Sequence, residues 1–253
     1  IVETTIGMQN VLNVASIAVA AIVMALTGFL YLHSRKQVDF YHSIPVRREM
    51  IFTVKYLNGI LIVLSMYLLN LFLAMGILAV NRVDISVLLP TGLMAFLVHA
   101  GGYLINYGLM VIAVVLTGNF FISILGGIVL FAYGPAIIAL IQGLMYLFFE
   151  TINLRGVGME QMMVNASPLP YYIEIVIDGA EREFAQYGQL IGPVGVMALV
   201  GLVMAFVAMF LYRKRPSEST GKAMAFAITK APIKILLVVP ITIAASLLFW
   251  NIY

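Results

Sequence analysis

The segment from Ile85 to Phe149 contains no Asp, Glu, Lys or Arg, and this uncharged run limits the possible folds more than any other feature. One crossing of a bilayer requires about 20 apolar residues, so the run is long enough to cross twice. The rest of the chain has the same character, because 63% of the 253 residues are hydrophobic and only 10% are charged. Soluble domains are about half apolar. We therefore predict an all-α integral membrane protein.

Six apolar stretches predict about six transmembrane helices. They are Met8–Leu32, Tyr56–Val80, Thr91–Leu116, Phe120–Phe149, Leu190–Tyr212 and Ile235–Tyr253. The fourth stretch exceeds one plain crossing, and Gly134-Pro135 predicts a kink, with Ala136–Phe149 as a separate short or re-entrant helix. No long polar linker divides the chain, so residues 1–253 are expected to form a single transmembrane domain.

The charged residues predict an orientation. Most of the 14 basic residues lie in residues 33–55 and 213–234, whereas acidic residues concentrate in residues 150–189. Because cytoplasmic loops are enriched in Lys and Arg, we expect both basic segments in the cytoplasm and residues 150–189 outside, as a short helix or a hairpin on the membrane. This topology accounts for the pI of about 9.1, so no nucleic-acid partner is predicted.

The chain lacks the motifs of a catalytic or metal centre. Its one Gly-Lys pair, Gly221-Lys222, precedes Ala223 and lacks the earlier glycine of a phosphate-binding loop. The sequence has no His-Glu-x-x-His spacing, no Gly-x-Ser-x-Gly elbow and no cysteine. We predict no catalytic residue, no metal ligand and no cofactor bound by this chain, which is not expected to be an enzyme by itself.

A polar face is predicted in the third apolar stretch, where His99, Tyr103 and Asn106 follow helical spacing. Polar groups inside a membrane span often mark a functional site, but they can equally be satisfied by hydrogen bonds to a neighbouring helix. In both cases the face should point toward protein. Close helix contacts are also expected at three glycine pairs, namely Gly101-Gly102, Gly126-Gly127 and Gly188 with Gly192.

The segment between the first two stretches mixes aromatic and charged residues. Val38, Phe40 and Tyr41 are interleaved with charged side chains, which predicts a short interfacial helix within Ser34–Glu49. Pro45 is predicted in the first turn of the helix that follows. By composition alone, the simplest interpretation is a basic loop that only fixes topology.

Two motifs resemble permease subunits of the type-2 ABC exporter family, in a branch from Gram-positive bacteria. The first is Ser34-Arg-Lys-Gln-Val-Asp-Phe-Tyr-His-Ser-Ile-Pro-Val-Arg-Arg-Glu49, and the second is Tyr212-Arg-Lys-Arg-Pro-Ser-Glu-Ser-Thr-Gly-Lys-Ala-Met-Ala-Phe226. The turn Leu116-Thr-Gly-Asn119 is a weaker third match. The resemblance covers most of the chain, and because such permeases have an additional span, it implies an N-terminal part before Ile1.

The resemblance implies a multi-pass subunit of a bacterial plasma membrane that dimerises with a copy of itself or a paralogue and contacts lipids. ABC ATPase subunits would bind ATP and Mg, and the substrate, exported or extracted, would be amphipathic, peptide-like or lipid-like. The implied ATPase-coupling residues are Arg35, Lys36, Val38, Asp39, Phe40, Tyr41, His42, Pro45, Arg47, Arg48, Glu49, Thr117, Gly118 and Asn119. The alternative function is a non-transporting membrane sensor or scaffold whose residues 150–189 bind an external ligand.

Overall fold

The computed structural model describes residues 2–8, 11–149, 158–182, 184–226, 228 and 230–250. All regular elements in this part of the chain are helices. Their bounds are α1 Val2–Thr5, α2 Val11–Gly28, η1 Leu30–His33, α3 Arg35–Ser43, α4 Arg48–Val80, α5 Ile85–Leu116, α6 Phe120–Phe148, α7 Met159–Asn165, α8 Pro168–Glu181, η3 Phe184–Leu190, α9 Ile191–Lys214, η4 Ser217–Ser219 and α10 Lys230–Trp250.

The long helices are those of a membrane protein. Four of the described helices have the length and apolar composition to cross a bilayer, namely α4, α5, α6 and α9, the last counted from Gln186. Helices α2 and α10 are also apolar, but their apolar parts, Leu12–Gly28 and Ile233–Leu247, are shorter. The protein is therefore an all-α membrane protein, in which four of the six expected spans meet the length of a full crossing.

Helix α5 is the centre of the molecule and contacts α2, α4, α6, α8 and α9. Small residues allow the backbones to approach, as membrane helices require. A Cβ added at Gly201 of α9 would lie 2.9 Å from Cβ of Leu104, and one added at Gly102 would lie 2.1 Å from the Tyr172 ring. The expected close contacts at Gly188 and Gly192 are wrong, because nothing lies within 4 Å of a Cβ at either position.

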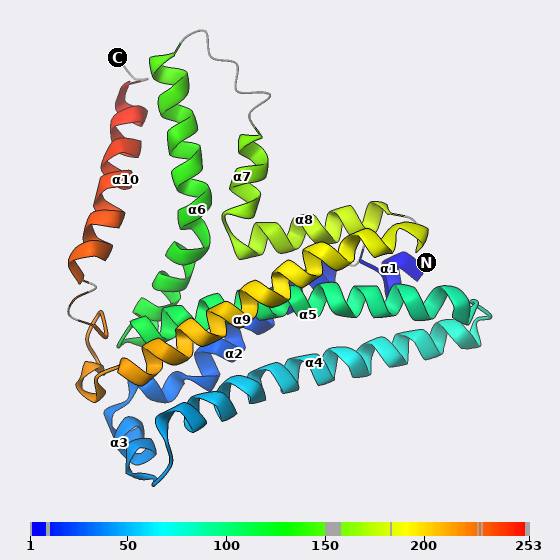
Figure 1. Cartoon of the computed structure of the whole chain (residues 1–253), viewed down its shortest axis with the longest axis horizontal. Coiled ribbons are helices and arrows are strands. Elements are labelled where there is room, and N and C mark those ends of the chain that lie inside the picture. The colour runs from blue at the N-terminus through cyan, green and yellow to red at the C-terminus, as the bar shows by residue number, and fades with distance from the viewer. Residues whose placement is uncertain are drawn as a thin grey trace.

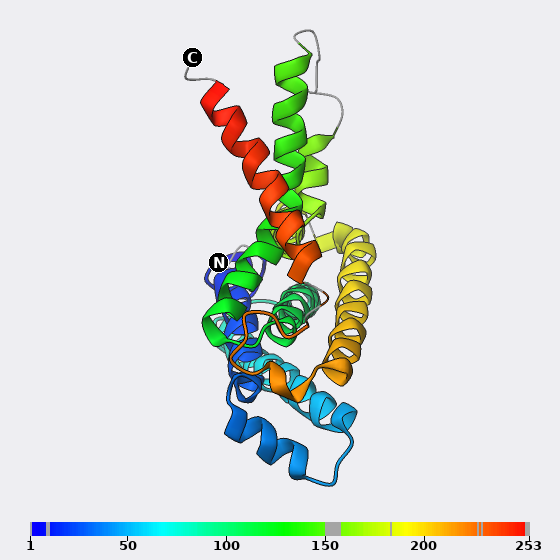
Figure 2. The same ribbon diagram turned by 90° about the vertical axis from the view of Figure 1, so that its left-hand side faces the viewer.

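The helices form two groups. Figures 1 and 2 show α2, α4, α5 and α9 running in the same general direction, whereas α6 and α10 leave them at a steep angle. Helix α6 continues through Pro135, so the separate helix predicted over Ala136–Phe149 is wrong. A proline removes only its own amide donor, and the remaining helical hydrogen bonds can carry the helix past it.

Residues 158–181 contain two short helices, α7 and α8, so a short helix, one of the two predicted alternatives, is what forms here. The junction between α7 and α8 meets the middle of α6, where a Cβ added at Gly134 would lie 2.2 Å from the carbonyl oxygen of Ala166. From there α8 returns along α5, as Figure 1 shows. Residues 150–157 of the expected external segment lie outside the described residues.

The two basic segments meet at one end of the molecule, which we call the α3 end. The segment after α9 folds back over the turn between α5 and α6. There the amide of Gly221 donates a 2.7 Å hydrogen bond to the Gly118 carbonyl, and the amide of Ala225 donates a 2.8 Å bond to the Leu116 carbonyl. The turn between α4 and α5 lies at the opposite end (Figure 1).

Candidate functional site

Helix α3 occupies the position predicted for the interfacial helix. It ends at Ser43, and the next residue, Ile44, has the extended backbone (ψ 132°) that a following proline imposes. The prediction for Pro45 is wrong, since α4 begins only at Arg48, beyond the proline. Residues 44–47 therefore connect α3 to α4 through a tight bend, in which the Val46 amide donates a 2.7 Å hydrogen bond to the Ile44 carbonyl.

The inner face of α3 is fixed to its neighbours. Val38 is 2% exposed, and the ring of Tyr41 lies 4.5 Å from the ring of Tyr31, centroid to centroid. The ammonium group of Lys55, on α4, donates a 3.2 Å hydrogen bond to the Tyr41 hydroxyl. Two predicted coupling residues, Val38 and Tyr41, thus hold α3 against η1 and α4.

The outer face of α3 is accessible. The aromatic side chain of Phe40 is 63% exposed. Its exposed neighbours include Arg35, Lys36 and Asp39. Pro45 and Arg47 are exposed as well, whereas the side chain of His42 lies outside those described.

Arg48 and Glu49, the last residues of the predicted coupling segment, are half-buried and connect α4 to the end of α9. A guanidinium nitrogen of Arg48 donates a 3.2 Å hydrogen bond to the carbonyl of Arg215. The carboxylate of Glu49 forms a 2.9 Å ion pair with Arg213. These contacts place both basic segments in one cluster.

Arg215 completes the C-terminus of α5. The last four carbonyl groups of an α-helix have no partner within the helix. Arg215 donates hydrogen bonds of 3.1 and 2.7 Å to the carbonyls of Val114 and Val115 and one of 3.1 Å to that of Leu32. Thr117 Oγ1 donates to the Ala113 carbonyl at 3.0 Å. With the bond from the Ala225 amide to Leu116, all four carbonyls are satisfied.

The position of Arg215 follows from the proline after it. Pro216 disfavours helix at the preceding residue, so α9 ends at Lys214 and Arg215 is extended (ψ 126°). Burial lowers the pKa of Arg215 to about 10, which leaves the side chain charged at neutral pH. A cation at this place also opposes the negative end of the α5 dipole. From the sequence, Arg215 is predicted only to lie in a cytoplasmic basic segment, and the Arg215-Pro216 pair at the end of a span is the signal for its capping role.

A second polar chain joins η1 to α6. His33 Nε2 lies 2.9 Å from Ser123 Oγ, which lies 2.5 Å from Thr117 Oγ1. Burial, followed by the charge of Arg215, lowers the pKa of His33 to about 4, so the imidazole is neutral at pH 7. The neutral imidazole can donate a hydrogen bond to Ser123 or accept one from it, and it adds no second positive charge beside Arg215.

The predicted coupling turn, Thr117 to Asn119, is largely covered. Thr117 and Gly118 are buried beneath the segment after α9, and a Cβ added at Gly118 would lie 2.1 Å from the Ser219 carbonyl oxygen. Asn119 caps α6, because its side chain accepts a 2.9 Å hydrogen bond from the Phe121 amide. Phe121 itself is 73% exposed and is the accessible apolar group of this turn.

The polar face of α5 lies inside the molecule, with His99, Tyr103 and Asn106 all at most 1% exposed. The Tyr172 hydroxyl lies 2.6 Å from His99 Nδ1 and joins α8 to α5. Tyr103 donates a 2.8 Å hydrogen bond to the Gly59 carbonyl of α4, and the Asn106 amide donates one of 2.7 Å to Gly102. His99 and Tyr103 thus connect α5 to α8 and α4, whereas the Asn106 bond lies within α5.

Among the described residues, no group of three His, Asp or Glu side chains could hold a metal ion. Comparisons with family models, with curated proteins and with solved structures found no match. Function must therefore be inferred from the residues themselves, of which those at the α3 end are the best organised.

Proposed function

We propose that this chain is the transmembrane permease subunit of an ATP-driven ABC transporter in a bacterial plasma membrane. A separate ABC ATPase subunit would bind and hydrolyse ATP with Mg, and a second permease subunit would complete the pore. The substrate would be an amphipathic, peptide-like or lipid-like molecule that is exported or extracted from the bilayer.

The observation that carries the proposal is the contrast between the two faces of α3. Val38 and Tyr41 fix the inner face, whereas Phe40 is 63% exposed between charged neighbours. An exposed aromatic residue with charged neighbours is typical of a protein-binding surface. A groove on an ATPase subunit is the partner that the resemblance of the Ser34–Glu49 segment implies.

The contacts behind α3 suit a mechanical role. Tyr41 binds Lys55 of α4, and Tyr31, in contact with Tyr41, donates a 2.8 Å hydrogen bond to the Tyr212 hydroxyl of α9. A displacement of α3 would therefore act on α4 and α9 together. Packed interfaces of this kind move as units and do not deform continuously.

The test is a comparison of Phe40→Ala with Phe72→Ala in the complex purified from the native host. Phe72 is a matched control, since it is 65% exposed on α4 but lies far from α3 along the chain. Burying a Phe side chain contributes about 1.5–3 kcal/mol, so Phe40→Ala should weaken the binding of the co-purified ATPase about tenfold or more. Its ATP hydrolysis should also become uncoupled from transport.

Phe72→Ala should leave both binding and coupling unchanged. The proposal fails if no subunit with ATP-binding motifs accompanies the chain. It fails equally if Phe40→Ala and Phe72→Ala behave alike. In that case a sensor or scaffold becomes the better interpretation.

A further inference from the structure

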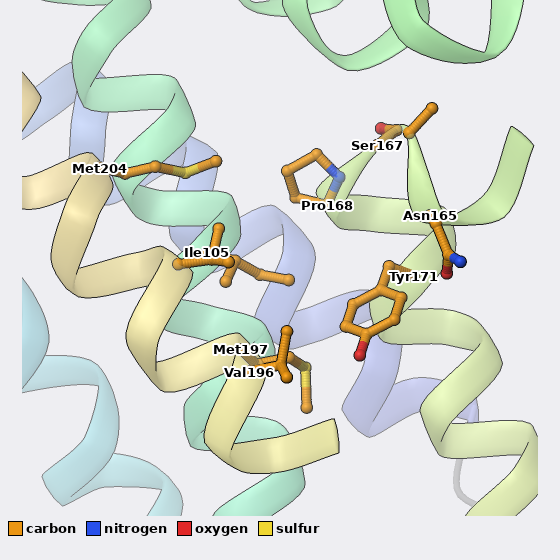
Figure 3. Close-up of a pocket in the computed structure, with 10 residues that line it drawn as sticks. Ile105, Asn165, Ser167, Pro168, Tyr171, Val196, Met197 and Met204 are labelled. Carbon is orange, nitrogen blue, oxygen red and sulfur yellow. The ribbon is translucent and has the colours of Figure 1, made fainter. Parts of the chain in front are cut away.

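A charged recess of about 580 Å³ lies at the α3 end, between the start of α4 and the last turn of α9. Its lining consists of Arg47, Arg48, Glu49 and Arg213, so three guanidinium groups face one carboxylate and leave an excess of two positive charges. In this it differs from the cavity of Figure 3, whose lining by α5, α9 and the α7–α8 junction includes no charged side chain. The recess is therefore suited to an anion.

Two of the three arginines are positioned by contacts between α4 and the end of α9. Arg213 forms its 2.9 Å ion pair with Glu49, and Arg48 donates its 3.2 Å hydrogen bond to the Arg215 carbonyl. Arg47 and Arg213 remain exposed. Each guanidinium carries five N–H donors, so these contacts leave donors for a ligand. Phosphate is the anion that such a planar fork of donors matches best.

The recess lies where two uncharged helical runs end. In α4 no charged residue follows Lys55, and in α9 none precedes Arg213. Both helices are long and apolar enough to cross a bilayer. Because charged side chains are costly in hydrocarbon, the uncharged runs occupy the bilayer interior and the arginines lie at its surface, at the depth of phospholipid head groups.

An apolar groove of about 490 Å³ continues from the recess between the same two helices. Its lining starts at Phe52 on α4 and Met209 on α9, about one helical turn, or about 5.4 Å, beyond the charged lining. On α9 it extends to Ala198, about 16 Å further at the helical rise per residue. Leu57 and Phe206 line the groove and are exposed, so it opens toward the surrounding lipid. Its shape and composition suit an acyl chain.

We infer that the recess and the groove together bind an anionic phospholipid. Its phosphate contacts Arg47, Arg48 and Arg213, and one acyl chain lies in the groove between α4 and α9. A zwitterionic head group lacks the net negative charge that complements the recess. The inference is independent of the proposed transport function, because lipid binding is measured on the purified chain without ATP and without an ATPase.

The probe is phosphatidylglycerol, and phosphatidylcholine with the same acyl chains is the zwitterionic comparison. Each lipid is titrated into the delipidated full chain in detergent, and native mass spectrometry measures the fraction of protein with bound lipid. Phosphatidylglycerol should bind about tenfold or more tightly, because the excess positive charge of the recess attracts its net charge. Equal affinity for the two lipids would overturn the inference.

The double variant Arg47→Gln/Arg213→Gln leaves one arginine against one carboxylate in the recess. Its affinity for phosphatidylglycerol should fall about tenfold, to that for phosphatidylcholine. The matched control is Lys222→Gln/Lys230→Gln, which removes two exposed positive charges that do not line the recess and should leave the affinity unchanged. Equal weakening in both double variants would indicate attraction to net charge only and would overturn the site. Unchanged affinity in the arginine variant would assign these side chains to another partner, such as an acidic protein surface, and would also overturn it.

The acyl chain is tested separately from the head group. Ala205→Trp fills the groove and should weaken the binding of phosphatidylglycerol about fivefold or more. Val207→Trp is the matched control, since Val207 is exposed on the same helix but does not line the groove. Equal affinities of these two variants would exclude the groove.

Glycerol 3-phosphate and inorganic phosphate distinguish a lipid site from a site for free phosphate. Both lack the acyl chain, so they should displace phosphatidylglycerol only at concentrations about 100-fold or more above that of the lipid. Displacement at a concentration equal to that of the lipid would identify a free phosphate site and would overturn the assignment to a phospholipid.

Discussion

The guanidinium of Arg215 donates a 2.7 Å hydrogen bond to the carbonyl oxygen of Val115, a residue 100 positions earlier in the chain. The same side chain reaches Leu32, so one arginine joins the ends of η1, α5 and α9. The α3 end is therefore a single hydrogen-bonded unit. Its stability should depend on residues that lie far apart in the sequence.

Replacing Arg215 by Ala should destabilise the protein by about 2–4 kcal/mol, because buried carbonyls lose their donors. Arg213→Ala is the matched control, since the Arg213 side chain is 68% exposed and, among the described residues, forms an ion pair with Glu49. Exposed pairs contribute about 0.2–1 kcal/mol, so this variant should unfold almost like the wild type. Thermal unfolding in detergent measures both, and equal losses of stability would contradict the role of Arg215.

Gly102→Ala should separate α8 from α5. The new Cβ would lie 2.1 Å from the Tyr172 ring, which must then move and weaken its hydrogen bond to His99. Overpacking of this kind costs about 1–3 kcal/mol or more. Gly192→Ala, where nothing lies within 4 Å, should be neutral or slightly stabilising. Protease sensitivity of residues 158–181 reports the separation, and equal protection of both variants would refute the contact.

Acidification should destabilise the α3 end through His33. Its pKa is about 4 in the folded protein, lowered by burial and by Arg215, against 6.5 for an unperturbed histidine. The unfolded chain therefore binds more protons between these values, and stability falls as the pH decreases from 6.5 toward 4. In His33→Gln the melting temperature should fall less over this range. Identical pH dependence in both proteins would exclude His33 as the source.

Cysteines at opposite ends of α4 should test the membrane topology. The chain has no cysteine, and Gln37 and Asn81 are both exposed, the first on α3 and the second after α4. Because α4 is long enough to cross a bilayer, Gln37→Cys and Asn81→Cys should react with a membrane-impermeant maleimide from opposite sides. Labelling of both from outside intact cells would contradict a crossing by α4.

The sequence by itself determined the class of the protein and the local bounds of several elements. Long uncharged apolar runs are stable only inside a bilayer. There the backbone must form its hydrogen bonds within the segment, so composition alone predicts helices. The interleaved apolar and charged residues correctly predicted the short helix α3, whereas the predicted start of the next helix at Pro45 was wrong, because α4 begins at Arg48. Of the six predicted spans, four correspond to described helices that meet the length of a full crossing, and the apolar parts of α2 and α10 are shorter.

Only the tertiary structure decided which side chains meet. In a membrane helix nearly every face is apolar, so periodicity does not identify the face that packs against protein. On the interfacial helix α3, Val38 and Tyr41 lie three residues apart on one face, and only the contacts with Tyr31 and Lys55 show that this face points inward and that Phe40 points outward. Nor could the sequence pair Arg215 with carbonyls about a hundred residues away, because that contact exists only after the ends of α5 and α9 are brought together by helix packing.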